Sequence, residues 1–177
     1  NGGEGAPLTP VFHRLLIKQK KIDLPVCVLN IGGISNVTVI HENDIKSLKS
    51  GKTMPVLLPG CSFFLDINYA PAKKLLSNGI PFAIASDFNP GSSPSGNMNF
   101  VVSTACIKMK LTAEEAINAA TINGAYAMGI GDKVGSITEG KVANLIITKD
   151  INSINEIPYS FGNGKISKVI LAGKIIN

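Results

Sequence analysis

The chain has 177 residues, of which 45% are apolar and 16% are charged, a composition typical of a globular protein. Its length allows one domain with a core or two small domains. No apolar run approaches the roughly 20 residues that a membrane-spanning helix needs, and the first residues lack the pattern of a signal peptide. We therefore predict a cytoplasmic protein without membrane contact. Because the chain begins with Asn1 and not with Met, we expect its true start to be missing.

The net charge of +5 comes almost wholly from lysine, since Arg14 is the only arginine among 17 basic residues. Bidentate contacts to phosphates and guanines favour arginine, and aromatic residues make up only 6% of the chain. The tight group Lys18–Lys21 is better explained as the solvated face of a helix, so no nucleic-acid partner is predicted. The cysteines Cys27, Cys61 and Cys106 have no CxxC spacing and are interpreted as buried reduced thiols.

Residues 1–44 predict a loop, a helix over Val11–Lys21, and two strands. The strands, Val26–Asn30 and Ser35–Ile40, are joined by Gly32 and Gly33 in a hairpin-like arrangement. Residues 45–53 continue in a polar, lysine-rich composition that indicates a linker or junction.

Residues 54–130 have the alternation of an α/β unit. Pro55–Leu58 predicts a short strand, and Pro71–Asn78 predicts a helix that Gly79 ends. The continuous apolar run Pro81–Ser86 is typical of a parallel strand buried on both faces. Two helices should follow, the second of which begins at a capping box.

That capping box is Thr112–Glu115, and Gly129 is the expected C′ residue of the same helix. Residues 131–177 then predict a small β-module, with strands at 142–147, 168–171 and 174–176. A tight hairpin at Ala172–Gly173 should join the last two strands.

The most site-like segment follows the apolar run Pro81–Ser86. In parallel α/β folds, functional groups lie at the carboxyl ends of strands, and Asp87 lies there, with Gly91 and two serines close behind. A purely structural interpretation is equally open, in which Asp87 and Asn89 form an Asx-turn and cap the next helix.

Five motifs carry a family resemblance by their order: Leu57–Leu65, Tyr69–Ala72, Asp87–Ser93, Asn118–Asn123 and Gly135–Lys141. In this order they resemble imidazolonepropionase, an amidohydrolase of histidine degradation. The Asp87–Ser93 loop is the most specific motif, whereas Gly135–Lys141 is a general amidohydrolase signature. The resemblance covers the chain from about residue 50 to its last residue. We therefore treat residues 54–177 as one imidazolonepropionase-like region.

The resemblance implies a partial (β/α)8-barrel, contributing the last strands and helices, followed by a β-module. It also implies a metal hydrolase in which Zn or Fe activates a water that opens the imidazolone ring of a small-molecule substrate, giving N-formimidoyl-glutamate. Asp87 matches a metal ligand, and Asn89, Gly91 and Ser92 match residues that contact the substrate. Asn144 and Ser160 depart from the family pattern, in which aspartate and histidine are usual.

The family's other metal ligands, its proton-transfer residues and its arginine for the substrate carboxylate lie upstream of the matched region. The chain offers only His13 and His41, which are not in ligand-like spacing. A catalytic zinc needs about three protein ligands. We therefore predict that Zn or Fe is not retained and that the chain alone is inactive, and no catalytic residue is assigned.

Residues 2–13 and 29–38 are similar to anhydro-N-acetylmuramic acid kinase, which has an actin-like fold. This resemblance implies that a small kinase-derived β segment precedes the barrel part. Gly32 and Gly33 would then lie near the ATP phosphates, because backbone amides of a glycine-rich turn suit phosphate oxygens. The kinase's catalytic aspartate would precede Asn1. A kinase fragment, or a non-catalytic chimeric chain, is thus the alternative interpretation.

The predicted solution state follows from the partial barrel. Two strands of eight leave unpaired edges and apolar faces that a closed barrel would cover. We expect an oligomer or an aggregation-prone chain.

Overall fold

The structure, a computed structural model, describes residues 42–51 and 53–176. The helix and the two strands predicted before residue 42 lie outside the described residues. The same holds for Gly32, Gly33, Cys27 and both histidines. Among the residues that are described, no helix is both long and apolar enough to cross a bilayer.

Helix α2 (Glu42–Ser50) occupies most of the segment that was predicted as a linker. Ile45 is buried and joins the core, Leu48 packs partly against it, and Lys46 and Lys49 are exposed. The spacing of Ile45 and Leu48 places both side chains on one helix face. The polar composition of this segment is therefore that of an amphipathic helix.

Two short strands form the centre of the described fold. Strand β1 (Val56–Leu57) pairs in parallel with β2 (Ala83–Ile84), with Val56 opposite Ala83 and Leu57 opposite Ile84. Both residues of β2 are buried, as the apolar run predicted. Parallel strands require a crossover, which the helices between them provide.

That crossover contains helices α3 (Pro59–Phe64) and α4 (Ala72–Ser77). Helix α4 was predicted, and Gly79 follows it with a φ of 70°, as a glycine at a helix end allows. Helix α3 was not predicted from the sequence. Proline suits the first helical turn, where its missing N–H costs nothing.

Three helices follow β2: α5 (Met98–Met109), α6 (Ala113–Ala120) and α7 (Ile122–Ala127). The capping box at Thr112 is confirmed, with Glu115 as its reciprocal partner. The single helix predicted up to Gly129 is instead broken at Thr121, whose φ and ψ are −113° and −86°. Gly129 does end α7, with a φ of 71°.

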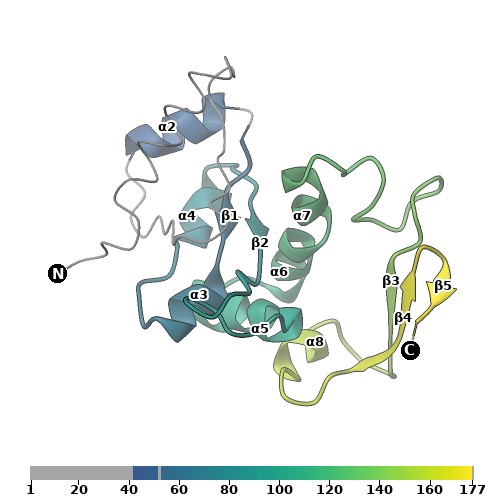
Figure 1. Ribbon diagram of the computed structural model, residues 1–177. Coiled ribbons are helices and arrows are strands. Elements are labelled where there is room, and N and C mark those ends of the chain that lie inside the picture. The colour runs from purple at the N-terminus through teal and green to yellow at the C-terminus, as the bar shows by residue number, and fades with distance from the viewer. Residues whose placement is uncertain (1–41, 52, 177) are drawn as a thin grey trace.

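The core lies between this small sheet and its helices. Figure 1 shows α6 and α7 stacked beside β2, with α5 crossing below them. Phe82 and Leu75 are among the largest fully buried side chains. The core cluster comprises Ile45, Leu57, Ala72, Leu75, Ile80, Phe82, Ile84, Val101, Val102, Ala105, Met109, Leu111, Ala116 and Ala119.

The predicted β-module is a separate antiparallel sheet in the order β3 (Leu145–Thr148), β4 (Ile166–Leu171) and β5 (Lys174–Ile175). Ala172 and Gly173 both have positive φ angles, 49° and 79°, as a tight hairpin of the predicted kind requires. Figure 1 shows this sheet to one side of the helices. None of its residues belongs to the core cluster.

Helix α8 (Glu156–Tyr159) lies between β3 and β4 in the chain. The residues that follow it contact helix α5. The side-chain amide of Asn99 on α5 donates to the carbonyl oxygen of Ser160 at 3.2 Å. The Phe100 ring lies edge-on to Phe63 of α3 and to Phe161, with centroid distances of 5.1 and 6.3 Å. Ser160 accepts this hydrogen bond with its backbone carbonyl oxygen. The contact with Asn99 therefore does not require the histidine side chain that is usual in the family.

The second departure from the family pattern, Asn144, also has a structural role. Its side-chain oxygen accepts a hydrogen bond from the backbone N–H of Ala172 at 2.9 Å. An aspartate would offer the same kind of acceptor. The substitution therefore preserves the contact that holds the β4–β5 hairpin against the segment before β3.

The cysteines agree with the interpretation as buried thiols where the structure describes them. Cys61 is fully buried, and Cys106 is half-buried. Burial, followed by the charges of Glu114 and Glu115, raises the pKa of the Cys106 thiol. A raised pKa keeps this thiol protonated and of low reactivity.

Candidate functional site

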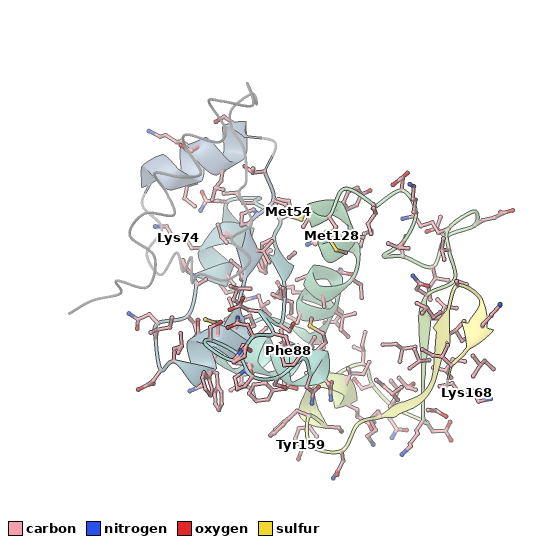
Figure 2. All side chains as sticks on the ribbon, viewed as in Figure 1. Met54, Lys74, Phe88, Met128, Tyr159 and Lys168 are labelled. Carbon is pink, nitrogen blue, oxygen red and sulfur yellow. The ribbon has the colours of Figure 1, made fainter. Side chains whose placement is uncertain are left out.

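The candidate site is the loop that follows β2 at its carboxyl end. Asp87 begins it with a φ of 52°, a left-handed conformation that aspartate adopts more readily than most residues. Phe88, which is labelled in Figure 2, has 69% of its surface exposed. The loop then turns back on itself, with Asn89 and Ser93 paired through reciprocal backbone hydrogen bonds of 3.0 and 3.1 Å.

The side chain of Asn89 organises this turn. Its oxygen accepts hydrogen bonds from the backbone N–H groups of Gly91 and Ser92, at 2.9 and 3.0 Å. Its nitrogen donates to the carbonyl oxygen of Asp87 at 2.8 Å and to the hydroxyl of Ser92 at 2.6 Å. The Asx-turn interpretation is therefore confirmed for Asn89.

The same interpretation was wrong about the cap of the next helix. Helix α5 is capped by Asn97, whose side chain accepts from the backbone N–H groups of Asn99 and Phe100. Asp87 is thus not used as a cap. Its carboxylate accepts instead from the Ser92 hydroxyl at 2.6 Å.

Helix α3 supports the loop from the other side. A Cβ at Gly60 would lie 3.1 Å from the Ser93 hydroxyl oxygen and 3.6 Å from the carbonyl oxygen of Ser86. Ser93 itself is only 3% exposed. Glycine at position 60 therefore lets α3 approach the loop closely, which gives a physical reason for this residue of the Leu57–Leu65 motif.

A second motif secures β2 from the helical side. The side-chain amide of Asn123 donates to the carbonyl oxygen of Phe82, next to β2, at 2.8 Å. The helix break at Thr121 separates α6 from α7, the helix that carries Asn123. Sequence reasoning matched this motif to a family but assigned no role to Asn123, because a contact between residues so far apart in the chain leaves no local signal.

The structure brings together the residues predicted for the metal and substrate roles: Asp87, Asn89, Gly91 and Ser92. Ser92 is 2% exposed, whereas Gly91 is exposed. Sequence reasoning missed Ser93 and Gly60 as supports of the loop. The buried pairing of Ser93 with Asn89 had no signal in the local pattern.

A shallow depression of about 250 Å³ lies away from this loop, at the other end of β2. Its lining includes Pro81, Phe82, Glu115 and Asn123. A hydrogen bond from Lys73, at 2.6 Å, is the main reason that the pKa of the Glu115 carboxyl lies below its usual range. Because none of the loop residues borders it, the depression is not the candidate site.

A metal would need more ligands than the loop supplies. Within residues 42–51 and 53–176, no three His, Cys, Asp or Glu side chains gather as a metal site requires. One carboxylate oxygen of Asp87 accepts from Ser92, and the other accepts no hydrogen bond in this part of the chain. The described residues therefore do not fit a metal by themselves, although Asp87 has the chemistry of a single ligand.

Comparison with known families gives a match to the amidohydrolase family over residues 16–176. The match crosses residues 45–53, where the sequence predicted a junction, and extends into the segment predicted as kinase-like.

Among curated proteins, the imidazolonepropionase of Flavobacterium johnsoniae is 59% identical over 147 residues, which are 83% of this chain and 36% of that enzyme. The imidazolonepropionase of Christiangramia forsetii is 58% identical over 180 aligned positions, which cover 93% of this chain and 44% of that enzyme. The chain thus spans less than half the length of these relatives.

Among solved structures, an adenosine deaminase from Xanthomonas campestris with bound zinc superposes with a TM-score of 0.70 at 27% identity. The similarity covers 78% of this chain and 35% of that one. It places the described α/β arrangement within the barrel fold of amidohydrolases, as part of that barrel.

Proposed function

Because the chain belongs to the amidohydrolase family, we propose that it supplies the Asp87 loop of an imidazolonepropionase. The reaction would be the hydrolytic opening of the imidazolone ring in histidine degradation, with N-formimidoyl-glutamate as the product. Identity of 58–59% to two imidazolonepropionases is the observation that carries the proposal. The cytoplasmic location predicted from the sequence belongs to the same proposal.

Within this function, Asp87 has the role of a single ligand in a metal site. Its place directly after a buried parallel strand supports this role, because functional groups of barrel enzymes come from the carboxyl ends of strands. The zinc in the Xanthomonas campestris structure supports a metal of that kind. Iron is the alternative that the sequence resemblance implies.

The chain alone should be inactive under this proposal. Asp87 would be one of about three protein ligands that a catalytic zinc needs, and the described residues do not assemble the others. The remaining ligands would come from the part of the relatives that this chain does not span. A small-molecule substrate would therefore be turned over only when that part is present.

A segment exchange tests the proposal. Residues 54–177 replace the matching segment of the Flavobacterium johnsoniae enzyme, and ring opening of imidazolone propionate is followed spectroscopically. We expect kcat/KM within about tenfold of the parent, or about 1.4 kcal/mol in the activation barrier. A folded exchange enzyme that binds metal and yet opens no imidazolone ring would overturn the assignment.

The kinase resemblance of residues 1–44 is a second, weaker proposal. It rests on Gly32 and Gly33, which lie outside the described residues. The amidohydrolase match begins at residue 16 and overlaps most of this segment, which favours the first proposal. Calorimetric titration with ATP separates the two, since a kinase fragment with a working phosphate loop would bind with a Kd near or below about 100 μM.

A further inference from the structure

Three asparagine–glycine pairs lie in the part of the chain that the structure describes: Asn78–Gly79, Asn123–Gly124 and Asn163–Gly164. Such a pair can close into a ring, because the backbone nitrogen of the glycine can attack the side-chain carbonyl carbon of the asparagine. Glycine favours this attack, since it has no Cβ to hinder the approach and its backbone turns freely. The reactivity of each pair therefore depends on how strongly the fold restrains the nitrogen and the amide.

The pair at the end of α4 is restrained at both reacting groups. The N–H of Gly79 donates to the carbonyl oxygen of Leu76 at 2.9 Å. The side-chain nitrogen of Asn78 donates to the carbonyl oxygen of Lys74 at 2.8 Å. Ring closure would have to break both hydrogen bonds, so this pair should react slowly.

The pair on α7 is restrained by its own helix and by the residue before β2. Asn123 and Gly124 both belong to α7, and a regular helix fixes φ and ψ in one narrow region. The side-chain nitrogen of Asn123 also donates to the carbonyl oxygen of Phe82 at 2.8 Å, in a partly buried contact. Bringing this amide to the Gly124 nitrogen would disrupt both restraints.

The third pair lacks these restraints. Asn163 and Gly164 are exposed and lie between α8 and β4, outside any helix or strand. Within the described residues, neither the Gly164 N–H nor the Asn163 side-chain amide has a hydrogen-bond partner. The backbone N–H of Asn163 donates to the carbonyl oxygen of Ser160 at 3.2 Å, which orders the turn just before the pair. The two reacting groups themselves are left free to meet.

From this contrast we propose that Asn163 is a modification site, at which the chain deamidates spontaneously through a succinimide. The Gly164 nitrogen loses its proton and forms a bond to Cγ of Asn163, while the Cγ–Nδ2 bond breaks. The leaving amide group takes up that proton and departs as ammonia. Water then opens the ring at either carbonyl carbon, giving aspartate or isoaspartate. The inference is independent of the proposed function.

The isoaspartate product should disturb the start of β4. Its main chain runs through Cβ and Cγ, which adds a carbon to the backbone shortly before Ile166, the first residue of β4. Lys165 lies between them, accepts from the N–H of Lys149 at 2.7 Å and pairs with Glu156 at 3.2 Å. The added carbon should weaken both contacts of Lys165, and the β3–β4 pairing should loosen where it begins.

The rates of the three pairs test the proposal. The full 177-residue chain is incubated in mildly alkaline buffer, and the deamidated products are measured by peptide mapping with mass spectrometry. We expect them to accumulate at least about tenfold faster at position 163 than at 78 or 123, where hydrogen bonds must break first. In denaturing urea the three rates should converge. Equal rates in the folded chain, or the same order with and without urea, would overturn the inference.

Two glycine substitutions separate the chemistry from the turn that carries it. An added Cβ at Gly162 or Gly164 meets no atom within 4 Å, and neither glycine has a positive φ. Both alanine variants should therefore fold like the parent, but only Gly164→Ala places a Cβ beside the attacking nitrogen. Gly164→Ala should slow deamidation at Asn163 several-fold, while the matched control Gly162→Ala keeps the parental rate. An unchanged rate in Gly164→Ala, or equal slowing in both variants, would contradict the proposed attack.

Hydrogen exchange measures the effect on β4. The chain that carries isoaspartate at position 163 is separated from the parent after ageing. Its Lys149 amide proton should exchange faster than in the parent, whereas the amide protons of α6, far from this turn in the sequence, should keep their rates. An unchanged Lys149 exchange rate would overturn the expected effect on the sheet.

Discussion

The backbone of Gly135 lies against the side chain of Ala125: a Cβ at position 135 would be 2.6 Å from the Ala125 Cβ. Gly135 also has a φ of 93°, which residues with a side chain rarely adopt. Lys141 closes the same loop by donating to the carbonyl oxygen of Gly131 at 2.6 Å and the Ser136 hydroxyl at 2.8 Å. The signature Gly135–Lys141 thus has a structural role, because its residues pack the start of the β-module against α7.

Gly135→Ala should therefore destabilise the chain by at least about 2 kcal/mol, because backbone strain and overpacking add. Gly140→Ala is the matched control, since Gly140 has a φ of 85° but no atom within 4 Å of an added Cβ. It should cost only the strain, about 1–2 kcal/mol. Urea unfolding of both variants measures the difference. Equal midpoints would show that the contact with Ala125 does not constrain this loop.

Stability should fall in acid partly through Glu115. Its pKa lies below the ordinary value of 4.5, chiefly because Lys73 donates a hydrogen bond to the carboxylate. A depressed folded-state pKa gives stability that is present above the unfolded pKa and lost as pH falls through the folded one.

Glu115→Gln tests this dependence, since glutamine can still serve in the capping box. Unfolding at about pH 6.5 and about pH 3.5 should show a smaller acid loss in the variant. The difference should be below about 1 kcal/mol, because the pair is partly exposed to solvent. Glu139→Gln, at an exposed position, is the matched control. An acid loss as large in Glu115→Gln as in the parent would rule out this carboxyl as the source.

The purified chain should hold no stoichiometric zinc or iron after dialysis and should not open the imidazolone ring. The reason is that the described residues gather no set of three possible ligands, while a catalytic zinc needs about three. Elemental analysis and a ring-opening assay on the same sample measure both properties. One tightly bound metal per chain together with turnover would contradict this prediction.

The chain should associate in solution. Its central sheet has two strands in the described residues, so both edges lack a neighbouring strand of that sheet. Large apolar side chains are exposed on several elements, including Phe63 at 55%, Ile107 at 56% and Ile146 at 62%. Sedimentation velocity should show species larger than the monomer. A single compact species of 18.6 kDa with cooperative unfolding would contradict this expectation.

The sequence correctly predicted those elements that depend on residues close together in the chain. The apolar run before Asp87, the capping box at Thr112 and the hairpin at Ala172–Gly173 are all present in the structure. Each depends on residues that are close in sequence. The helix break at Thr121 was missed, because the helix was expected to continue from the capping box to its C′ glycine, Gly129.

The sequence proposed residues for the candidate site, but it could not predict the hydrogen bonds between them. Motif resemblance selected Asp87, Asn89, Gly91 and Ser92, and they lie together. The direction of the hydrogen bonds could not be derived from residue types, because serine can donate or accept and either end of an asparagine amide can face the backbone. Only the folded geometry shows that the Asn89 side chain bonds to Asp87, Gly91 and Ser92 inside the loop.

The most direct measurement is made on the segment-exchanged imidazolonepropionase carrying Asp87→Ala. If Asp87 is the functional group that this chain supplies, the variant should lose bound metal and ring-opening activity together. The matched control is Asp66→Ala, which changes another aspartate with a positive φ and should retain both properties. Far-UV circular dichroism confirms that each protein is folded. Parent-level metal content and turnover in the Asp87→Ala enzyme would contradict the assignment of this loop as the functional site.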